Sequence, residues 1–147
     1  MLSKTCKYAL RAIIYIAKSN VKENKIRIKE ITEKIDVPTH FLAKILQNLV
    51  KEGLMSSTKG PLGGFYIDRP LCEMTLLDVV KVVEGKEYLE YCLLKNEPCD
   101  CMSTTKRHCP LHESFCRAKQ EIRRFYQETT LYDIVMGMEI QEDLISL

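Results

Sequence analysis

Apolar residues recur at helical spacing along the first third of the chain. Over residues 3–19 they lie three or four positions apart, whereas Lys4, Lys7 and Arg11 share a different face. This spacing aligns one apolar stripe and predicts an amphipathic helix with a basic side. A run of isoleucines over residues 28–35 predicts a short second helix by the same rule.

A third helix is expected to run from about residue 38 to residue 52. Pro38 suits the first turn of a helix, where its missing N–H would have no partner, and Gly53 suits the position after a helix end. Residues 54–58 and 65–68 predict two short strands around the glycine- and proline-rich turn at 59–64. Two helices, a turn and a hairpin in this order predict a winged helix-turn-helix.

The second half of the chain begins with a helix and continues as a loop. Thr75 and Asp78 have the spacing of a capping box, which predicts a helix through Val83. Residues 86–109 show little periodicity and predict a loop. A last short helix should follow Thr130, which has the capping pattern of Thr75.

Before that last helix, the segment Pro110–Gln127 predicts a long helix with a heptad-like seam. Apolar residues along it are spaced alternately by four and three positions, which suits a partner helix and predicts a homodimer. Packing of this face on its own domain is the alternative. The seam consists of Leu111, Phe115, Ala118, Ile122 and Phe125.

Composition narrows the class of protein. Hydrophobic residues make up 46% and charged residues 29% of the chain, as in ordinary globular proteins. The sequence contains no run of 18 apolar residues that could span a membrane. Lys7 and Arg11 interrupt the N-terminal apolar stretch and no small-residue cleavage site follows, which argues against a signal peptide. We therefore expect a cytoplasmic protein, where clustered cysteines favour metal binding or redox chemistry over structural disulfides.

Charge divides the chain into two unlike halves. Residues 1–70 carry 13 Lys and Arg against 6 Asp and Glu, whereas residues 71–147 carry 9 against 14. The first half is therefore net +7 and the second half net −5. Such an uneven distribution of charge is expected when only the basic part of a protein binds a polyanion such as nucleic acid.

The polar face of the third helix carries groups that can read DNA bases. The polar residues lie at steps of four, three and four, opposite the apolar face: His40, Lys44, Gln47 and Lys51. A helix of this kind would fit the major groove. Hydroxyls, a lysine and glycines around the wing turn suit phosphate contacts, and aromatic residues at core-like positions favour double-stranded over single-stranded DNA. A solvated polar face is the alternative. The candidate DNA contacts are Lys4, Lys7, Tyr8, Pro38, Thr39, His40, Lys44, Gln47, Lys51, Ser57, Lys59, Gly60 and Pro61.

Five of the seven cysteines and two of the three histidines lie between residues 91 and 117. A core needs apolar volume rather than thiols, so this density indicates bound metal or thiol chemistry. Thiolates with a histidine suit an iron–sulfur cluster, which we favour over zinc because zinc sites usually contain two tight cysteine knuckles. A thiol switch, which needs only two neighbouring cysteines, remains an alternative. The candidate metal ligands are Cys92, Cys99, Cys101, Cys109 and His112.

The remaining thiols are expected to serve packing. Cys6 and Cys72 are isolated in the sequence and should be small core residues. Cys116 lies one helical turn beyond His112 and could face the metal site, although packing is the expected role here too. The chain has no nucleophile–base pattern and no deaminase-like H-x-E with C-x2-C, so we do not expect an enzyme.

Several segments share their pattern with one known family. They are Lys7-Tyr8-Ala9-Leu10, Val37-Pro38 with Phe41-Leu42-x2-Ile45-Leu46-x2-Leu49, the wing Gly60-Pro61-Leu62-Gly63-Gly64-Phe65, and Cys109-Pro110-Leu111-His112. In these segments the chain resembles the Rrf2 family of bacterial winged-helix repressors, which includes the iron–sulfur regulators IscR and NsrR. The resemblance covers about residues 1–135.

The resemblance implies a homodimer that is joined through the long helix and binds a near-palindromic operator. It implies three cluster cysteines, which fall on Cys92, on Cys99 or Cys101, and on Cys109. The histidine ligand of IscR-like members falls on His112. The cluster is then either [2Fe–2S] or [4Fe–4S].

We therefore expect a DNA-binding transcriptional regulator, a repressor, whose operator affinity is controlled by an iron–sulfur cluster that senses redox state, nitric oxide or cluster status. The alternatives are a cluster-free repressor that responds to thiols or an effector, and a zinc-bearing interaction protein. The fold class is mainly α with a small β-hairpin wing. The expected parts are a winged helix-turn-helix domain (1–84), a cysteine-rich cluster-binding loop (85–109), a dimerisation helix with a C-terminal helix (110–138) and a tail (139–147).

Overall fold

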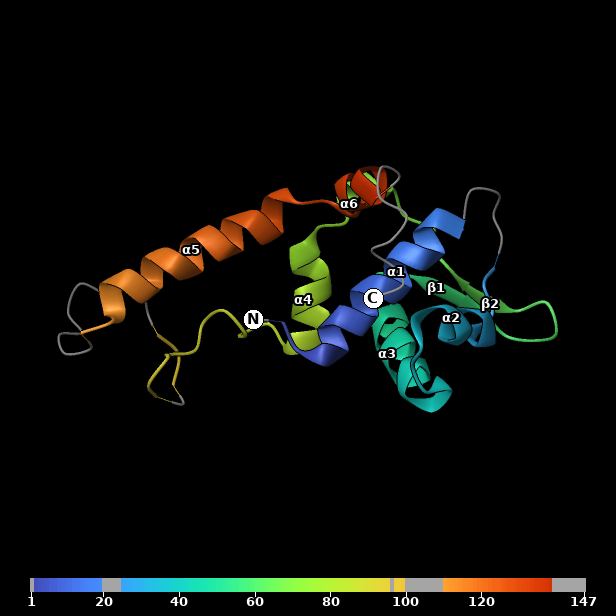
Figure 1. The fold of residues 1–147 in the computed structure, drawn as a ribbon, viewed down its shortest axis with the longest axis horizontal. Helices are drawn as coiled ribbons and strands as arrows, with labels where there is room; N and C mark the ends of the chain where they lie inside the picture. The colour runs from blue at the N-terminus through green and yellow to red at the C-terminus, as the bar shows by residue number, and fades with distance from the viewer. Residues whose placement is uncertain (1, 20–24, 96, 100–109, 139–147) are drawn as a thin grey trace.

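The amphipathic segments of the sequence fold as helices and one hairpin (Figure 1). The structure is a computed structural model that describes residues 2–19, 25–95, 97–99 and 110–138. The helices are α1 (Lys4–Ser19), α2 (Ile28–Ile35), α3 (Thr39–Lys51), α4 (Leu76–Glu84), α5 (His112–Glu128) and α6 (Leu131–Met138), with a 3-10 turn at Leu71–Glu73 and strands β1 (Ser56–Thr58) and β2 (Gly64–Tyr66). The predicted fold class, mainly α with a β-hairpin wing, is confirmed.

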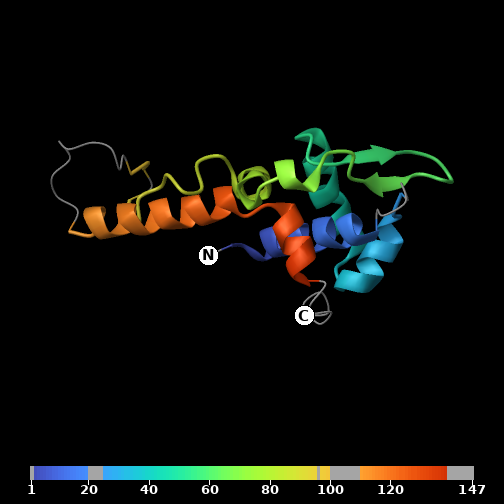
Figure 2. The ribbon, with the colours of Figure 1, turned by 90° about the horizontal axis from the view of Figure 1, so that it is seen from above.

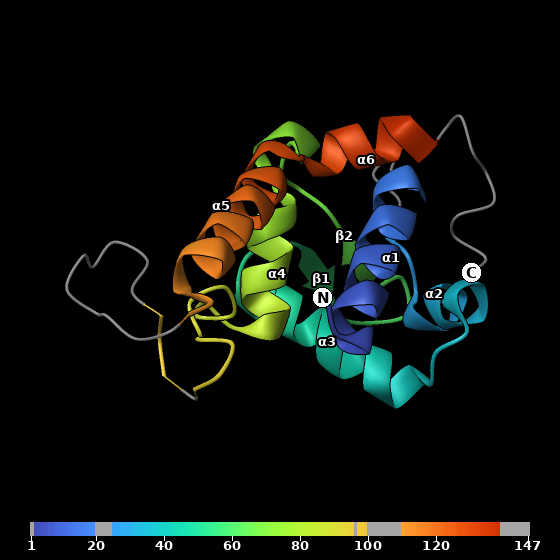
Figure 3. The same ribbon diagram turned by 60° about the vertical axis from the view of Figure 1, so that its left-hand side comes forward.

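Helix α1 lies at the centre of the fold. It contacts α2, α3, α4 and α6, which surround it in Figure 3. Its apolar stripe, including Ala9, Ile13 and Ile16, is fully buried, whereas Lys4 and Lys7 on the other face are exposed. The lysines of the predicted basic side therefore face solvent, whereas Arg11 is half-buried.

Helices α2 and α3 form the helix-turn-helix. Asp36 ends α2 in the left-handed region at φ 50°, and Pro38 directly precedes the first residue of α3. Proline disfavours helical backbone in the residue before it, which separates the two helices at this point. Gly53 follows α3 at φ 74°, a conformation that glycine adopts without steric cost.

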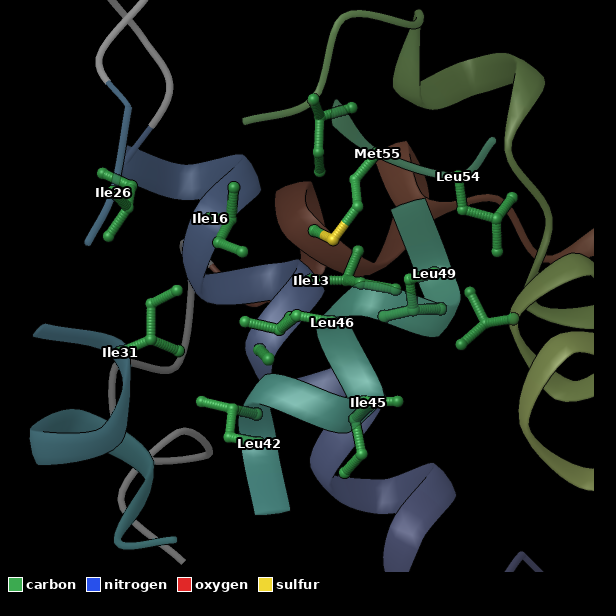
Figure 4. Close-up of a cluster of buried hydrophobic side chains, with 14 of the residues drawn as sticks. Ile13, Ile16, Ile26, Ile31, Leu42, Ile45, Leu46, Leu49, Leu54 and Met55 are labelled. Carbon is green, nitrogen blue, oxygen red and sulfur yellow. The ribbon is translucent and has the colours of Figure 1, made fainter. Parts of the chain in front are cut away.

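The main core fills the space between α1 and α3 (Figure 4). Buried isoleucines of α1 pack against the apolar face of α3, and Leu54 and Met55 close the core beyond the end of α3. Each such side chain contributes about 1.5–3 kcal/mol when it is fully buried. The side chains labelled in Figure 4 are Ile13, Ile16, Ile26, Ile31, Leu42, Ile45, Leu46, Leu49, Leu54 and Met55.

The wing is an antiparallel hairpin in which Ser57 is paired with Phe65. Its strands are shorter than predicted because Leu54, Met55 and Ile67 turn into the core instead of extending the ladder. Ile26 also pairs with Phe65 through two backbone hydrogen bonds of 2.9 Å, which fastens the wing to the segment that leads into α2.

Helix α4 connects the two ends of the molecule, because it contacts both α3 and α5 as well as α1. The predicted capping box is present: the Asp78 N–H donates to Thr75 Oγ1, and the Thr75 N–H donates to the Asp78 carboxylate. Helix α5 extends away from α1–α3, with the wing at the opposite end (Figures 1 and 2). None of the helices in the described ranges is both long and apolar enough to cross a bilayer.

Candidate metal centre and nucleic-acid interface

The first turns of α5 place two soft ligands on one side of the helix. His112 and Cys116 are four residues apart, so their side chains are neighbours on the helix surface. The Sγ atom of Cys116 lies 3.9 Å from Nε2 and 4.0 Å from Nδ1 of His112. Cys116 is 6% exposed. Its burial agrees with the expected packing role, but its sulfur also faces the histidine.

Residues 90–95 and 97–99 form a narrow turn that we call the ligand hairpin. The Cys92 N–H donates to the Glu97 carbonyl over 2.8 Å, and the Cys99 N–H donates to the Glu90 carbonyl over 2.5 Å. Tyr91 and Pro98 form an antiparallel bridge between these bonds. The sequence predicted only a loop here. The hairpin brings Cys92 and Cys99 to the same end of α5.

The hairpin and α5 together gather three possible metal ligands. The Sγ atom of Cys99 lies 3.4 Å from Nδ1 of His112. One ligand atom each of Cys99, His112 and Cys116 lies within 4.8 Å of the others. Bonds of 2.0–2.3 Å at tetrahedral angles separate neighbouring ligands by roughly 3.5–3.8 Å. The group therefore has the spacing and the donor types of a tetrahedral metal site, after small side-chain movements.

Cys92 lies beside this group with its thiolate form favoured. The Leu94 N–H donates to Cys92 Sγ over 3.4 Å and is the main cause that lowers the pKa of this thiol. The Lys95 N–H and the Cys99 side chain lower it further. Because a metal binds the thiolate, this lowered pKa favours Cys92 as a fourth ligand.

The structure describes three of the five predicted metal ligands. Cys92, Cys99 and His112 are brought to one place, whereas Cys101 and Cys109 lie outside the described residues, as does His108. Cys92 and Cys99 keep their thiol groups outside any disulfide. Cys116 is in a disulfide, so it can bind metal only once that bond is reduced. Cys6 is buried as predicted, but the prediction for Cys72 is wrong, because the 3-10 turn Leu71–Glu73 holds it exposed.

The polar face of α3 is exposed along its whole length. Its predicted base contacts do not take part in the core, and Lys44, Gln47 and Lys51 line a groove of about 530 Å³ with Thr5 of α1 and Val83 of α4. The exposed residues of this surface, with the turn before it, are Pro38, Thr39, His40, Lys44, Gln47 and Lys51. The α1 candidates Lys4 and Lys7 are also exposed, and Tyr8 stacks edge-on against Phe41 of α3 at 6.1 Å between ring centroids.

The wing turn presents a second exposed surface, which is held in shape from α2. Ser57, Lys59, Gly60 and Pro61 are exposed. The Arg27 guanidinium donates to the Pro61 carbonyl over 2.5 Å. Sequence reasoning missed this role of Arg27, because nothing in the spacing of residues 27 and 61 links them. Gly60 has φ 106°, and a Cβ at Gly63 would lie 2.2 Å from the Thr58 carbonyl oxygen, so the tight turn requires both glycines.

One hydrogen bond joins the polar face of α3 to α4. The side-chain amide of Asn48 donates to the Val82 carbonyl over 3.1 Å. Val82 lies in the last turn of α4, where carbonyl groups lack partners within the helix. At its other face α4 packs on α5, where Tyr126 joins a buried cluster with Leu76, Leu77, Val80 and Cys6. A continuous set of contacts thus runs from α5 to α3.

Comparison with known proteins gives consistent results. Residues 2–137 match the family model Rrf2, described as an iron-dependent transcriptional regulator. A protein of Aquifex aeolicus assigned as an HTH-type transcriptional regulator is 30% identical over 135 residues, which cover 92% of this chain and 91% of that protein. The HTH-type transcriptional regulator IscR of Vibrio cholerae is 24% identical over 141 residues, or 96% of this chain and 78% of that protein.

The fold is also similar to that of a solved structure. The structure of CymR, the global cysteine regulator of B. subtilis, superposes with a TM-score of 0.73 at 22% sequence identity. The match covers 93% of this chain and 97% of that chain. At this level of identity the likeness concerns the fold.

Proposed function

Because the chain belongs to the Rrf2 family of transcriptional regulators, we propose that it binds operator DNA as a homodimer and that an iron–sulfur cluster sets its DNA affinity. The observation that carries this proposal is the convergence of Cys99, His112 and Cys116 at the start of α5. The proposed ligands remain Cys92, Cys99, Cys101, Cys109 and His112, with Cys116 added because its sulfur faces the same point.

The donor set fits an iron–sulfur cluster. Such clusters take cysteine thiolates, and histidine replaces some of them in known classes. Two separate elements supply the ligands, α5 and the ligand hairpin, and their sulfur and nitrogen atoms lie within 4.8 Å of one another. When bound, the cluster supplies an inorganic centre that reacts with oxidants or nitric oxide. The chain itself supplies the orientation, because His112 and Cys116 are fixed by the helix and Cys92 and Cys99 by the hairpin.

The DNA-binding part of the proposal rests on two exposed surfaces. In each protomer α3 would enter the major groove, where Lys44 and Gln47 reach base edges and Lys51 reaches phosphate. The wing turn at Ser57–Pro61 and the start of α1 would contact the flanking phosphates. The net charge of +7 over residues 1–70 favours this half of the chain as the DNA-binding half.

The homodimer part of the proposal rests on the seam of α5. Leu111, Ile122 and Phe125 are 41%, 42% and 57% exposed in the single chain. A row of large apolar side chains along one face of an extended helix suits a second copy of the same helix. A symmetric dimer would present two α3 helices to a near-palindromic operator. In this arrangement the winged helix-turn-helix (1–84) would bind DNA, the cysteine-rich loop (85–109) the cluster, and the C-terminal helices (110–138) the partner protomer.

Coupling between cluster and DNA would pass through α4. Assembly of the ligand set orders the hairpin against the start of α5, and α5 packs on α4, whose last turn accepts the Asn48 hydrogen bond from α3. Coupling between two sites is typically worth about 1–3 kcal/mol, which changes affinity by roughly 5- to 150-fold. This range is sufficient to switch a repressor on and off its operator.

Iron and acid-labile sulfide analysis of protein purified without oxygen tests the cofactor directly. We expect iron and sulfide in equal amounts, together with visible absorbance that bleaches on exposure to oxygen or nitric oxide. One zinc ion per chain, with no uptake of iron on reconstitution, would show that the cluster proposal is wrong. A zinc-bearing interaction protein would in addition show no salt-dependent binding to DNA.

A second candidate is a cluster-free repressor that responds to thiols or to an effector. It is favoured by the disulfide at Cys116, and by the fold likeness to CymR, a regulator named for cysteine. Two nearby thiols suffice for such a switch. Mass spectrometry of cysteine oxidation, together with metal analysis, separates the two candidates, because this one requires reversible oxidation at Cys116 in metal-free protein.

A further inference from the structure

Lys119 on α5 is buried, and among the residues that the structure describes it is the one buried charged side chain. Its exposed fraction is 6%. The ammonium Nζ lies 5.0 Å from the centre of the Phe115 ring, a favourable cation–π contact. Removing an ammonium from water costs several kcal/mol unless hydrogen bonds and negative charge compensate. The position of Lys119 therefore needs a specific explanation.

The hydrogen bonds of Lys119 go to the base of the ligand hairpin. Nζ donates to the carbonyl oxygens of Glu90 and Tyr91, each over 3.4 Å. The Glu90 carbonyl also accepts the Cys99 N–H, which closes the hairpin. Tyr91 directly precedes Cys92. The ammonium of Lys119 thus holds the first arm of the hairpin just before Cys92, at the carbonyl that also accepts the N–H of Cys99 from the second arm.

Lys119 also lies on the ligand side of α5. It follows Cys116 by three residues and His112 by seven, so the three side chains share one face of the helix. Cysteines bind metal as thiolates, which gives the ligand set negative charge. In the described part of the chain, ion pairs of α5 join Arg123 to Glu90 and Arg124 to Glu121, both on the exposed surface. Thiolates bound to a metal on this side of α5 would supply negative charge on the helix face that carries the ammonium.

We propose that Lys119 is a positioning residue for the metal centre: it docks the Cys92–Cys99 hairpin on α5 and offsets the charge of the bound thiolates. The inference rests on the proposed metal site and adds a residue outside its ligand set. Partners of this outer kind typically change metal affinity by about 10- to 100-fold when they are removed. The positive charge also favours the reduced form of a bound cluster, which carries one more negative charge.

The test uses the full chain, with its disulfide reduced and oxygen excluded, and Co²⁺ as the metal probe. Binding is followed by the absorbance of the cobalt–thiolate bonds. Lys119→Met keeps the length of the side chain but removes both the charge and the hydrogen bonds, and we expect cobalt affinity to fall at least about 10-fold. Lys119→Arg keeps the charge and should stay within about threefold of wild type. The matched control is Arg123→Met. Arg123 lies four residues further along α5 and forms an exposed ion pair of 3.6 Å with the carboxylate of the same Glu90. Its loss should change cobalt affinity less than twofold.

A second readout separates charge from simple packing. In protein reconstituted with iron and sulfide, Lys119→Met and Lys119→Gln should both shift the midpoint potential to more negative values, whereas Lys119→Arg should leave it unchanged. Cobalt affinity and potential at wild-type values in Lys119→Met would overturn the inference while leaving the metal site intact. Failure of Lys119→Arg to retain cobalt, in a chain with wild-type helix content, would overturn the charge role. Wild-type protein that binds neither cobalt nor iron would overturn the metal site and this inference together.

Discussion

The Sγ atom of Cys99 lies 3.4 Å from Nδ1 of His112, although the two residues are thirteen positions apart in the chain. The two side chains come from different elements, the ligand hairpin and the first turn of α5. Their contact exists only while the hairpin is docked on the helix. A metal bound by both would therefore hold the hairpin in place, beside Leu111, where the exposed seam of α5 begins.

His112→Ala should remove metal binding more completely than its surface position suggests. The imidazole is the ligand shared between Cys99 on the hairpin and Cys116 on α5, so its loss leaves no nitrogen donor in the group. We expect iron content after reconstitution to fall to a small fraction of wild type. His112→Cys should retain iron with altered visible absorbance, because thiolate can replace imidazole. Glu113→Ala, at the next and exposed position, is the control; equal iron in His112→Ala and Glu113→Ala would contradict the assignment.

Substitutions on α3 should separate base contacts from phosphate contacts. Gln47→Ala should cost about 1–3 kcal/mol on the preferred operator and relax its preference at one base pair. Lys51→Ala should weaken binding to all DNA sequences and lower the slope of log affinity against log salt by about 1. Arg124→Ala on α5 is the control, because this exposed arginine lies outside the proposed DNA surface. An unchanged salt slope in Lys51→Ala would exclude its phosphate contact.

Thr75→Ala should destabilise the whole fold. Thr75 caps α4 in a reciprocal pair with Asp78, and the backbone on either side of it bonds to residues 129 and 131, where α5 meets α6. Loss of such a cap costs about 1 kcal/mol, or about 3 °C in melting temperature for a chain of this size. Thr32→Ala within α2, whose hydroxyl only bonds back to the Lys29 carbonyl, should change stability by less than about 0.5 kcal/mol. Calorimetry of both variants checks this. Equal melting temperatures of Thr75→Ala and Thr32→Ala would show that the cap contributes nothing to stability.

Alkaline pH should destabilise the protein through Cys6. Burial, and then the nearby Glu84 carboxylate, raise the pKa of this thiol from 9.0 to about 12. Between these values the unfolded chain has released a proton that the folded chain still holds, so the free energy of unfolding falls as pH rises through this window. Burial also raises the pKa of Tyr88 and Tyr126 beside it, with the same sign. Urea unfolding of Cys6→Ala should fall less steeply with pH than wild type, and an identical pH slope in the two would contradict the role of Cys6.

The sequence predicted the helices well because their signals are local. The isoleucines of α2, Pro38 before α3 and the Thr75–Asp78 box each act within a few residues, and the structure places the elements within one or two residues of expectation. The prediction that Cys72 is buried was wrong for a related reason. An isolated cysteine is typical of a core, but the 3-10 turn that exposes Cys72 has no comparable sequence signal.

The metal centre depends on contacts between distant residues, so the sequence predicted its ligand types but not its construction. The hairpin uses backbone bonds between residues 90 and 99, which side-chain periodicity does not reveal. A lysine on a polar helix is expected in solvent, and contacts with the Glu90 and Tyr91 carbonyls and the Phe115 ring accompany the burial of Lys119. Cys116 could be related to His112 by helical spacing, and that spacing was the one available indication of its position.

Operator binding by cluster-loaded and cluster-free protein tests the central claim most directly. The two forms should be prepared without oxygen from the same sample and titrated with one operator duplex at fixed salt, because protein–DNA affinity depends steeply on salt. We predict that the two dissociation constants differ by at least about fivefold, the lower end of ordinary coupling between sites. Equal dissociation constants, with the cluster intact in the loaded sample, would contradict control of DNA binding by the metal centre.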